Sequence, residues 1–160
     1  VLSWAHDILI EEGFLYSSSI FPIVHDRYGI PDFERFPLQL QRRSGSIWEF
    51  PLTTLRVGQK NLPVAGGGYL RLLPVRAIAK ALAQVNEREG QPAIVYMHPW
   101  EIDPGIPRFS QGALRDFRGY VGLSSMMGKL NYLMKKLPFT TVRKVLEDCG
   151  AEFEELRAAS

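Results

Sequence analysis

Apolar residues recur at helical spacing in four parts of the chain. The pattern predicts helices over residues 3–12, from Pro74 to just before Gly90, over 124–137 and over 142–149. In the first and third of these, the residues expected to face the core are Leu2, Ala5, Ile8 and Leu9, and then Met127, Leu130, Leu133, Met134 and Leu137. Amphipathic helices of this kind need a second layer to cover their apolar face.

Shorter apolar runs between these helices predict strands. Residues 14–16 and 139–141 are expected to form short strands, and residues 46–57 alternate in a way that indicates two strands broken at Pro51. The run at 93–98 is apolar without interruption, as in a parallel strand covered on both faces. Residues 17–45 show no sustained period and are predicted to be a long ordered loop.

The order of these elements is typical of an α/β fold with a small β insertion at 46–64. A length of 160 residues suits one domain, which we assign to 1–150, followed by a tail at 151–160. The apolar fraction of 46% and the charged fraction of 22% are those of an ordinary globular protein.

Charge and cysteine content narrow the classes of function. The net charge is +2 and the basic residues are scattered, which argues against a nucleic-acid binder. No apolar run approaches a membrane span, and no signal peptide is expected. Cys149 is the only cysteine, so an internal disulfide is impossible, and we predict a cytoplasmic location.

The candidate chemistry gathers at the end of the predicted strand 93–98. His98 stands at its carboxyl end, where parallel α/β folds place their active sites, and it could serve as a proton donor or could simply cap the strand. Trp100 and Glu101 could bind a sugar, although a tryptophan can equally anchor a loop. The turn ending at Tyr69 could approach a ligand or be a tight turn only.

Metal and nucleophile signatures are weak in this sequence. Its histidines are His6, His25 and His98, and no two of them have the spacing of a helical metal pair. We therefore expect no complete metal site within the chain. No nucleophile elbow is present, which argues against a serine hydrolase.

Several segments together resemble one known family. They are residues 13–22 (GFLYSSSIFP), 25–31 (HDRYGIP), 61–69 (NLPVAGGGY), 96–104 (YMHPWEIDP) and 139–142 (FTTV). This set is similar to the NodB-homology polysaccharide deacetylases of carbohydrate esterase family four, in the subgroup associated with bacterial exopolysaccharide gene clusters. The resemblance spans about residues 5–146.

The resemblance implies a fold and a reaction. The chain is expected to be the C-terminal part of a NodB-type (β/α)7 barrel, in an enzyme that hydrolyses N-acetyl groups of amino sugars with a divalent metal, usually zinc. Tyr96-Met97-His98 resembles the family's Leu-x-His motif, which makes His98 the general acid. The aspartate that usually supports this histidine falls at Ser17, so the residue that orients His98 has to be another one.

The same resemblance assigns substrate contacts and leaves two other functions open. Ser18, Tyr69, Trp100 and Glu101 are expected to contact the polysaccharide. The family's base and metal motifs have no counterpart in the chain, which is therefore expected to act with a missing N-terminal half or as a homo-oligomer. A non-catalytic carbohydrate-binding or assembly module is the main alternative, and a truncated product without function is another.

Overall fold

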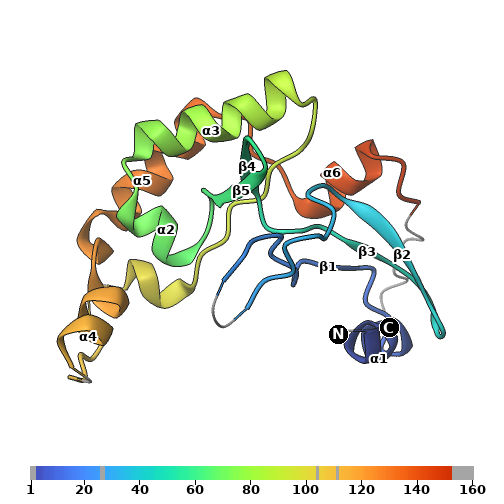
Figure 1. The fold of residues 1–160 in the computed structure, drawn as a ribbon, viewed down its shortest axis with the longest axis horizontal. Helices are drawn as coiled ribbons and strands as arrows, with labels where there is room; N and C mark the ends of the chain where they lie inside the picture. Colours follow the sequence, from blue (N-terminus) through green and yellow to red (C-terminus); the bar gives the residue numbers. More distant parts are fainter. Residues whose placement is uncertain (1–2, 26–27, 104, 111, 153–160) are drawn as a thin grey trace, which may run out of the picture.

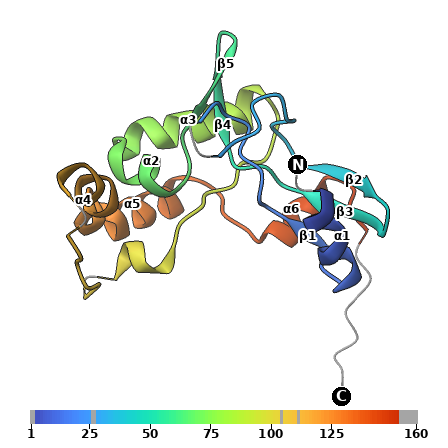
Figure 2. The ribbon, with the colours of Figure 1, turned by 60° about the horizontal axis from the view of Figure 1, so that its bottom comes forward.

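The elements form two groups that are joined by an extended segment (Figure 1). The computed structural model describes residues 3–25, 28–103, 105–110 and 112–152. Helices α2, α3 and α5 make one group, and a three-stranded sheet with α1 and α6 beside it makes the other (Figures 1 and 2). The hairpin β4–β5 lies between them, and residues 91–98 run through the middle of the molecule.

The sheet-containing group is built mainly from the first half of the chain. Its elements from that half are α1 (Ser3–Glu11), β1 (Tyr16–Ser17), β2 (Leu38–Arg42) and β3 (Gly45–Glu49), and the hairpin between the groups consists of β4 (Thr54–Val57) and β5 (Lys60–Pro63). The helical elements that follow are α2 (Gly67–Leu72), α3 (Val75–Arg88), the 3-10 helix η1 (Pro99–Ile102), α4 (Ala113–Tyr120), α5 (Leu123–Lys136) and α6 (Val142–Asp148).

Strand β3 is the centre of the larger sheet, whose order is β1-β3-β2. It pairs in parallel with β1, with Tyr16 opposite Trp48, and antiparallel with β2. The second sheet is the antiparallel hairpin β4–β5. The two strands predicted on either side of Pro51 are thus confirmed as β3 and β4. Strand β2, however, lies in the stretch predicted to be a loop, although the Leu-Gln-Leu-Gln alternation of residues 38–41 is a strand signal that the prediction overlooked.

The segment 93–98 is extended but does not form the predicted strand. Its only strand-type pairing among the described residues is a parallel bridge between Tyr96 and Gly66. Thr53 makes a second attachment to the segment, because its hydroxyl accepts a hydrogen bond from the Ile94 N–H at 2.7 Å and donates one to the Ile94 carbonyl at 2.9 Å. A strand needs a ladder of backbone bonds to a neighbour. Here a single bridge and one side chain replace that ladder.

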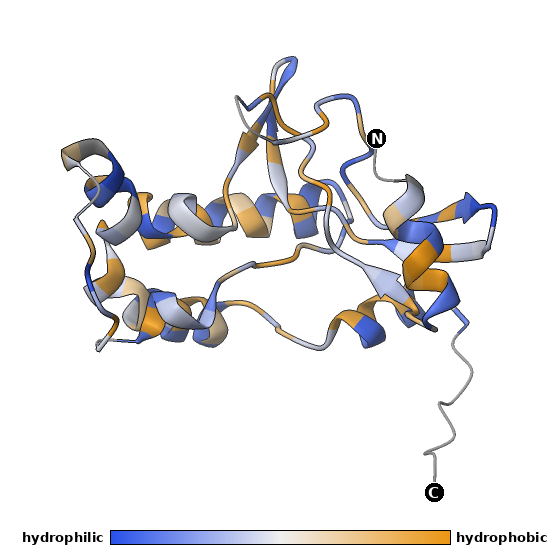
Figure 3. Cartoon of the chain, turned by 90° about the horizontal axis from the view of Figure 1, so that it is seen from below, coloured by the Kyte–Doolittle hydropathy of each residue, from blue (hydrophilic) through white to orange (hydrophobic). Residues whose placement is uncertain are grey.

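The same segment nevertheless alternates as a strand does. Ala93, Val95 and Met97 pack against the helical core, whereas Ile94 packs against the smaller core beside the sheet. Figure 3 shows how apolar this central segment is. Because side chains in extended chain alternate between two faces, Tyr96 and His98 share one face.

Two apolar clusters hold the molecule together. The larger cluster contains Val64, Ala65, Leu70, Ile78, Ala81, Leu82, Met126 and Leu133. The smaller cluster contains Phe50, Leu146 and Ala151. Since Ala151 is buried in the second cluster, the boundary predicted between the domain and the tail is wrong at that residue. The rest of the predicted tail, from 153 on, lies outside the described residues.

Two of the predicted helical faces need correction. In α5, Leu130, Leu133 and Leu137 pack in the core as predicted, but Met126 is buried in place of Met127, and Met134 is exposed. In α1, Ile8 is exposed and the buried side chain is His6. In both cases a neighbouring residue had an equally apolar or amphipathic side chain, so periodicity alone could not select the face.

Other elements also differ from the sequence-based expectations. Helices α2 and α4 were not predicted, because α2 starts within three glycines and α4 follows a proline-rich stretch. Residues 139–141 are not a strand, and Thr141 instead caps α6 by accepting the Lys144 N–H. The structure is mixed α/β, and membership of a larger (β/α)7 barrel stays a prediction.

Helices α2 and α5 are joined by partly buried polar contacts. The Lys129 ammonium donates to the carbonyls of Leu70, Arg71 and Leu73 at 3.0, 2.6 and 2.8 Å. Burial lowers the pKa of Lys129, but three carbonyls at the end of a helix still favour its cation. This contact fixes the end of α2 next to the residues described below.

Gly122 and Gly128 offer a matched pair of tests for this packing. Gly122 has a φ of +74°, and a Cβ there would lie 2.5 Å from the Arg71 carbonyl oxygen. We expect Gly122→Ala to lower the free energy of unfolding by about 1–3 kcal/mol. Gly128 lies within α5 with no neighbouring atom within 4 Å of its added Cβ, so Gly128→Ala should raise it by about 0.5–1 kcal/mol. Urea titration measures both, and equal losses would contradict the expectation.

Candidate carbohydrate-binding and proton-donor site

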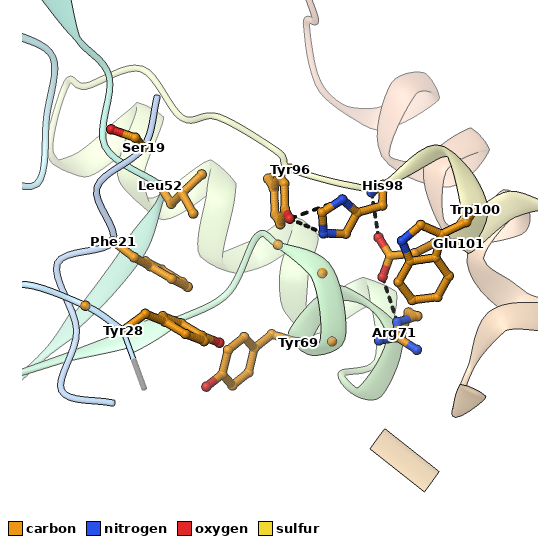
Figure 4. A pocket seen from close by; sticks show the side chains of 14 residues that line it. Ser19, Phe21, Tyr28, Leu52, Tyr69, Arg71, Tyr96, His98, Trp100 and Glu101 are labelled. Atoms are coloured by element: carbon orange, nitrogen blue, oxygen red, sulfur yellow. Dashed lines mark hydrogen bonds and ion pairs between the residues drawn. The ribbon is translucent and has the colours of Figure 1, made fainter. Parts of the chain in front are cut away.

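A pocket of about 400 Å³ lies where the two groups of elements meet. Four parts of the chain line it: the loop between β1 and β2, Leu52 between β3 and β4, the glycine turn and first turns of α2, and residues 96–101 (Figure 4). Five aromatic side chains contribute to its wall, namely Phe21, Tyr28, Tyr69, Tyr96 and Trp100. Aromatic faces of this kind can pack against the C–H face of a sugar ring.

His98 is exposed and lies on the wall of this pocket, although the segment before it is not the strand that was predicted to end there. Its imidazole Nε2 is hydrogen-bonded to the Tyr96 hydroxyl. Its backbone N–H donates to Glu101 Oε2 at 2.8 Å, which closes a capping box at the start of η1. The side chain and the backbone of His98 are therefore both held by residues within three positions of it.

Glu101 differs from the role predicted for it. It is 1% exposed, and its Oε1 lies 2.7 Å from Nε of Arg71, which is itself 7% exposed. Because one carboxylate oxygen faces the guanidinium and the other accepts the His98 N–H, Glu101 positions other residues rather than reaching out to a sugar. The ion pair between Arg71 and Glu101 is therefore buried.

Arg71 connects the pocket to helix α4. Its two terminal nitrogens donate to the carbonyls of Gly119 at 2.6 Å, Val121 at 3.3 Å and Arg118 at 3.2 Å. These carbonyls belong to the last turn of α4, where backbone acceptors have no helical partner. The guanidinium thus supports the pocket wall and the end of a helix at once.

Trp100 is half-buried and contacts both the His98 imidazole and the Arg71 guanidinium. Its ring stacks on the His98 imidazole with centroids 5.8 Å apart and planes 16° apart. The Arg71 guanidinium carbon lies over the Trp100 ring, 5.2 Å from its centroid. Trp100 therefore anchors the loop, which was the alternative reading of the sequence, and it also contributes to the pocket wall.

The opposite wall carries Tyr69, Tyr28 and Phe21 (Figure 4). Tyr69 meets Phe21 edge to face with centroids 6.4 Å apart, and Phe21 stacks on Tyr28 at the same separation. His25 stacks on Tyr28 at 3.8 Å. The prediction that Tyr69 lines the groove is consistent with this position, and the other aromatic residues of this wall were missed.

The serines after β1 are placed differently from the prediction. Ser18 donates its hydroxyl to the Phe50 carbonyl at 2.7 Å, and it is Ser19 that lines the pocket. The Ser17 hydroxyl donates to the Ser19 hydroxyl at 3.0 Å. The proposed contact between Ser18 and substrate is therefore not supported, because its side chain is turned towards β3.

Glu49 is a structural residue of the site that the sequence did not reveal. It is fully buried at the end of β3, and its carboxylate accepts the N–H groups of Ser19 and Ile20 at 2.8 and 2.9 Å. His6 Nε2 lies 3.3 Å from the other carboxylate oxygen. These bonds fix the loop that carries Ser19 and Phe21 to the pocket. A lone acid within an apolar strand, as in IWEFPL, is the signal that could have pointed to it.

Burial and charge also affect Tyr96. Burial raises the pKa of its phenol, and the Glu101 carboxylate and the Tyr28 phenol raise it further. The hydroxyl of Tyr96 is therefore protonated at neutral pH and can both donate and accept a hydrogen bond.

The described residues do not fit a metal centre. Within them, no three His, Cys, Asp or Glu side chains lie close enough together to hold an ion. The imidazole of His98 contacts the Tyr96 phenol, and its backbone N–H donates to the Glu101 carboxylate. Neither contact brings a second metal-ligating side chain to the imidazole. We therefore derive no step through a metal from these residues.

The structure is a mixed α/β protein with a pocket lined by five aromatic side chains. Residues 18–147 match a family described as a domain of unknown function, DUF3473, and the chain belongs to that family. This domain family is associated with polysaccharide deacetylases. Neither the curated proteins nor the solved structures gave a significant match to the chain. In the part of the chain that is described, no helix has the length and apolar character needed to cross a bilayer.

Proposed function

We propose that this chain forms the sugar-binding and proton-donating side of a polysaccharide deacetylase, which removes N-acetyl groups from amino sugars. One observation carries the proposal: an exposed imidazole, held at its side chain and its backbone, lies on the wall of a pocket lined with five aromatic rings. The association of the domain family with polysaccharide deacetylases agrees with this reading. We also assign the reaction to the bacterial cytoplasm.

His98 supplies the proton that amide cleavage requires. When the C–N bond of the tetrahedral intermediate breaks, the departing sugar amine needs a proton, because an unprotonated amide nitrogen is a very poor leaving group. The imidazolium of His98 gives this proton and becomes neutral, and the acyl carbon leaves as acetate. The activated water is provided by groups that the described residues do not supply.

The aromatic wall binds and orients the sugar. Tyr28 and Tyr69 face the side of the pocket that carries Tyr96, His98 and Trp100 (Figure 4). A sugar ring between them would bring its acetamido group towards the imidazole. The same wall also favours the alternative of a non-catalytic carbohydrate-binding module, since it needs no proton donor.

Acetate release separates the two functions. The complete protein that contains this domain is incubated with an N-acetylated oligosaccharide, and acetate and free amine are quantified. Equal amounts of acetate and new amine are expected for a deacetylase. Saturable binding of the oligosaccharide without any acetate release would contradict the proposal and support the binding module.

The aromatic wall can be tested by removing one ring. We expect Tyr69→Ala to weaken oligosaccharide binding about 5–10-fold, which corresponds to loss of about 1 kcal/mol of ring contact. Isothermal titration calorimetry measures this change. Tyr16→Ala, which removes an exposed ring that does not line the pocket, serves as the control and should leave the dissociation constant unchanged. Equal effects of the two substitutions would argue against Tyr69 as a sugar contact.

A further inference from the structure

Tyr96 lies two residues before His98 on the same face of the extended segment. Its hydroxyl is hydrogen-bonded to His98 Nε2 and lies 3.4 Å from Nδ1, and the two rings meet edge to face with centroids 4.8 Å apart. Of the residues that the structure describes, Tyr96 is the one whose side chain bonds the imidazole. In the motif that this stretch resembles, an apolar leucine stands in its place.

The backbone holds Tyr96 firmly in this position. Its N–H donates to the Ala65 carbonyl at 2.9 Å, and its carbonyl accepts the Gly67 N–H at 3.2 Å. Gly66 allows the ring to lie close, because a Cβ at that residue would be 2.9 Å from Tyr96 Cδ1. The glycine turn thus makes room for the tyrosine ring, which gives the turn a role beyond a change of chain direction.

A phenol can hold an imidazole in either protonation state. It accepts from the Nε2–H of an imidazolium, and it still accepts from the Nε2–H of the neutral ring after the Nδ1 proton has passed to the leaving amine. Because its pKa is raised, the phenol keeps its proton through both states at neutral pH. The hydrogen bond therefore persists while His98 gives up its proton.

We propose that Tyr96 is the positioning residue for His98, and that it takes the place of the carboxylate that the resemblance would put at Ser17. This inference rests on the proposed function. Ser17 itself is bonded to Ser19. Glu101 adds a second support from the backbone of His98, but its side chain is committed to Arg71.

The test compares two substrates in the complete protein. An N-acetylated oligosaccharide has an amine leaving group that must be protonated, whereas an aryl acetate releases a phenolate that departs without a proton. Loss of proton donation therefore slows hydrolysis of the amide and spares that of the ester. A general structural defect slows both.

We expect Tyr96→Phe to lower kcat for the amide about 10–100-fold, the scale of a misplaced catalytic group. The KM for the amide and the rate with the aryl acetate should stay within about twofold. In a His98→Ala background the same substitution should have no further effect, because Tyr96 acts through His98. Tyr16→Phe, which removes an exposed phenol outside the pocket, should change neither rate.

Gly66→Ala provides a second route to the same result. The added methyl group displaces the Tyr96 ring without removing its hydroxyl, so it should also reduce amide hydrolysis selectively. Equal slowing of both substrates by Tyr96→Phe, or no slowing of either, overturns the inference. A further loss in the His98→Ala background overturns it as well.

A spectroscopic measurement separates this inference from the proposed function. In ¹⁵N-histidine-labelled protein, Tyr96→Phe should shift the His98 ring nitrogen signals, and Tyr16→Phe should not. If His98→Ala retains full amide hydrolysis, the proposed function fails even though the signals shift. If His98→Ala loses amide hydrolysis while Tyr96→Phe shifts no signal, the role of Tyr96 alone is overturned.

Discussion

Replacement of His98 by alanine is expected to lower amide hydrolysis by the complete protein about 10²–10⁴-fold, the usual effect of removing a positioned proton donor. The imidazole is an exposed side chain on the pocket wall, and histidine is the side chain that most often transfers protons in enzymes. Acetate release from an N-acetylated oligosaccharide at several substrate concentrations measures the change. The loss should fall on kcat, because the proton is transferred only as the bond breaks.

The fold should tolerate this substitution. His98 is exposed, and its hydrogen bond to Glu101 comes from the backbone and does not depend on its side chain. His98→Gln is the matched control, since it keeps a polar side chain beside Tyr96 but cannot transfer a proton. Both variants should therefore unfold at the same temperature as the parent protein and should be similarly inactive. Near-normal turnover by either variant would show that His98 is not the acid.

Sequence periodicity predicted the parts of the fold whose stability is local. Helix α3 has a strong apolar stripe, and Ile78, Leu82 and Val85 are buried as expected. Pro51 separates β3 from β4 because a proline cannot continue the ladder. The position of His98 at the pocket followed from a similar signal, since an apolar run that ends at a proline marks the point where an extended segment turns away.

The remainder depended on contacts between distant residues. Glu101 and Arg71 are 30 positions apart, and nothing in either local sequence shows that they form a buried pair. Glu49 likewise organises Ser19 and Ile20 from another strand. Tyr96 read as an apolar position of a covered strand, and its contact with His98 is seen only in the structure, where alternation along the extended segment places both side chains on one face. Local patterns cannot encode such pairings, which arise from tertiary structure.

The buried pair of Arg71 and Glu101 gives rise to the largest expected effect on stability. Arg71→Met is expected to lower the free energy of unfolding by about 3–5 kcal/mol, because it leaves the Glu101 carboxylate buried without its cation. The carbonyls of Arg118, Gly119 and Val121 also lose their donors. Arg71→Lys should not restore stability, because an ammonium cannot reach the carboxylate and the helix end together.

A double substitution isolates the contribution of the unpaired charge. Arg71→Met combined with Glu101→Leu removes both charges, so the double variant should be more stable than Arg71→Met alone, as replacement of buried ion pairs by apolar residues often shows. The control is Arg143→Met, which breaks an exposed i, i+4 pair with Glu147 on α6 and should cost no more than about 0.5 kcal/mol. Urea titration with a constant m-value provides all four free energies. If Arg71→Met lowered the free energy of unfolding no more than Arg143→Met does, the buried pair would contribute as little as a surface ion pair. Residues other than Arg71 would then have to hold Glu101, and through Glu101 the backbone of His98, in place.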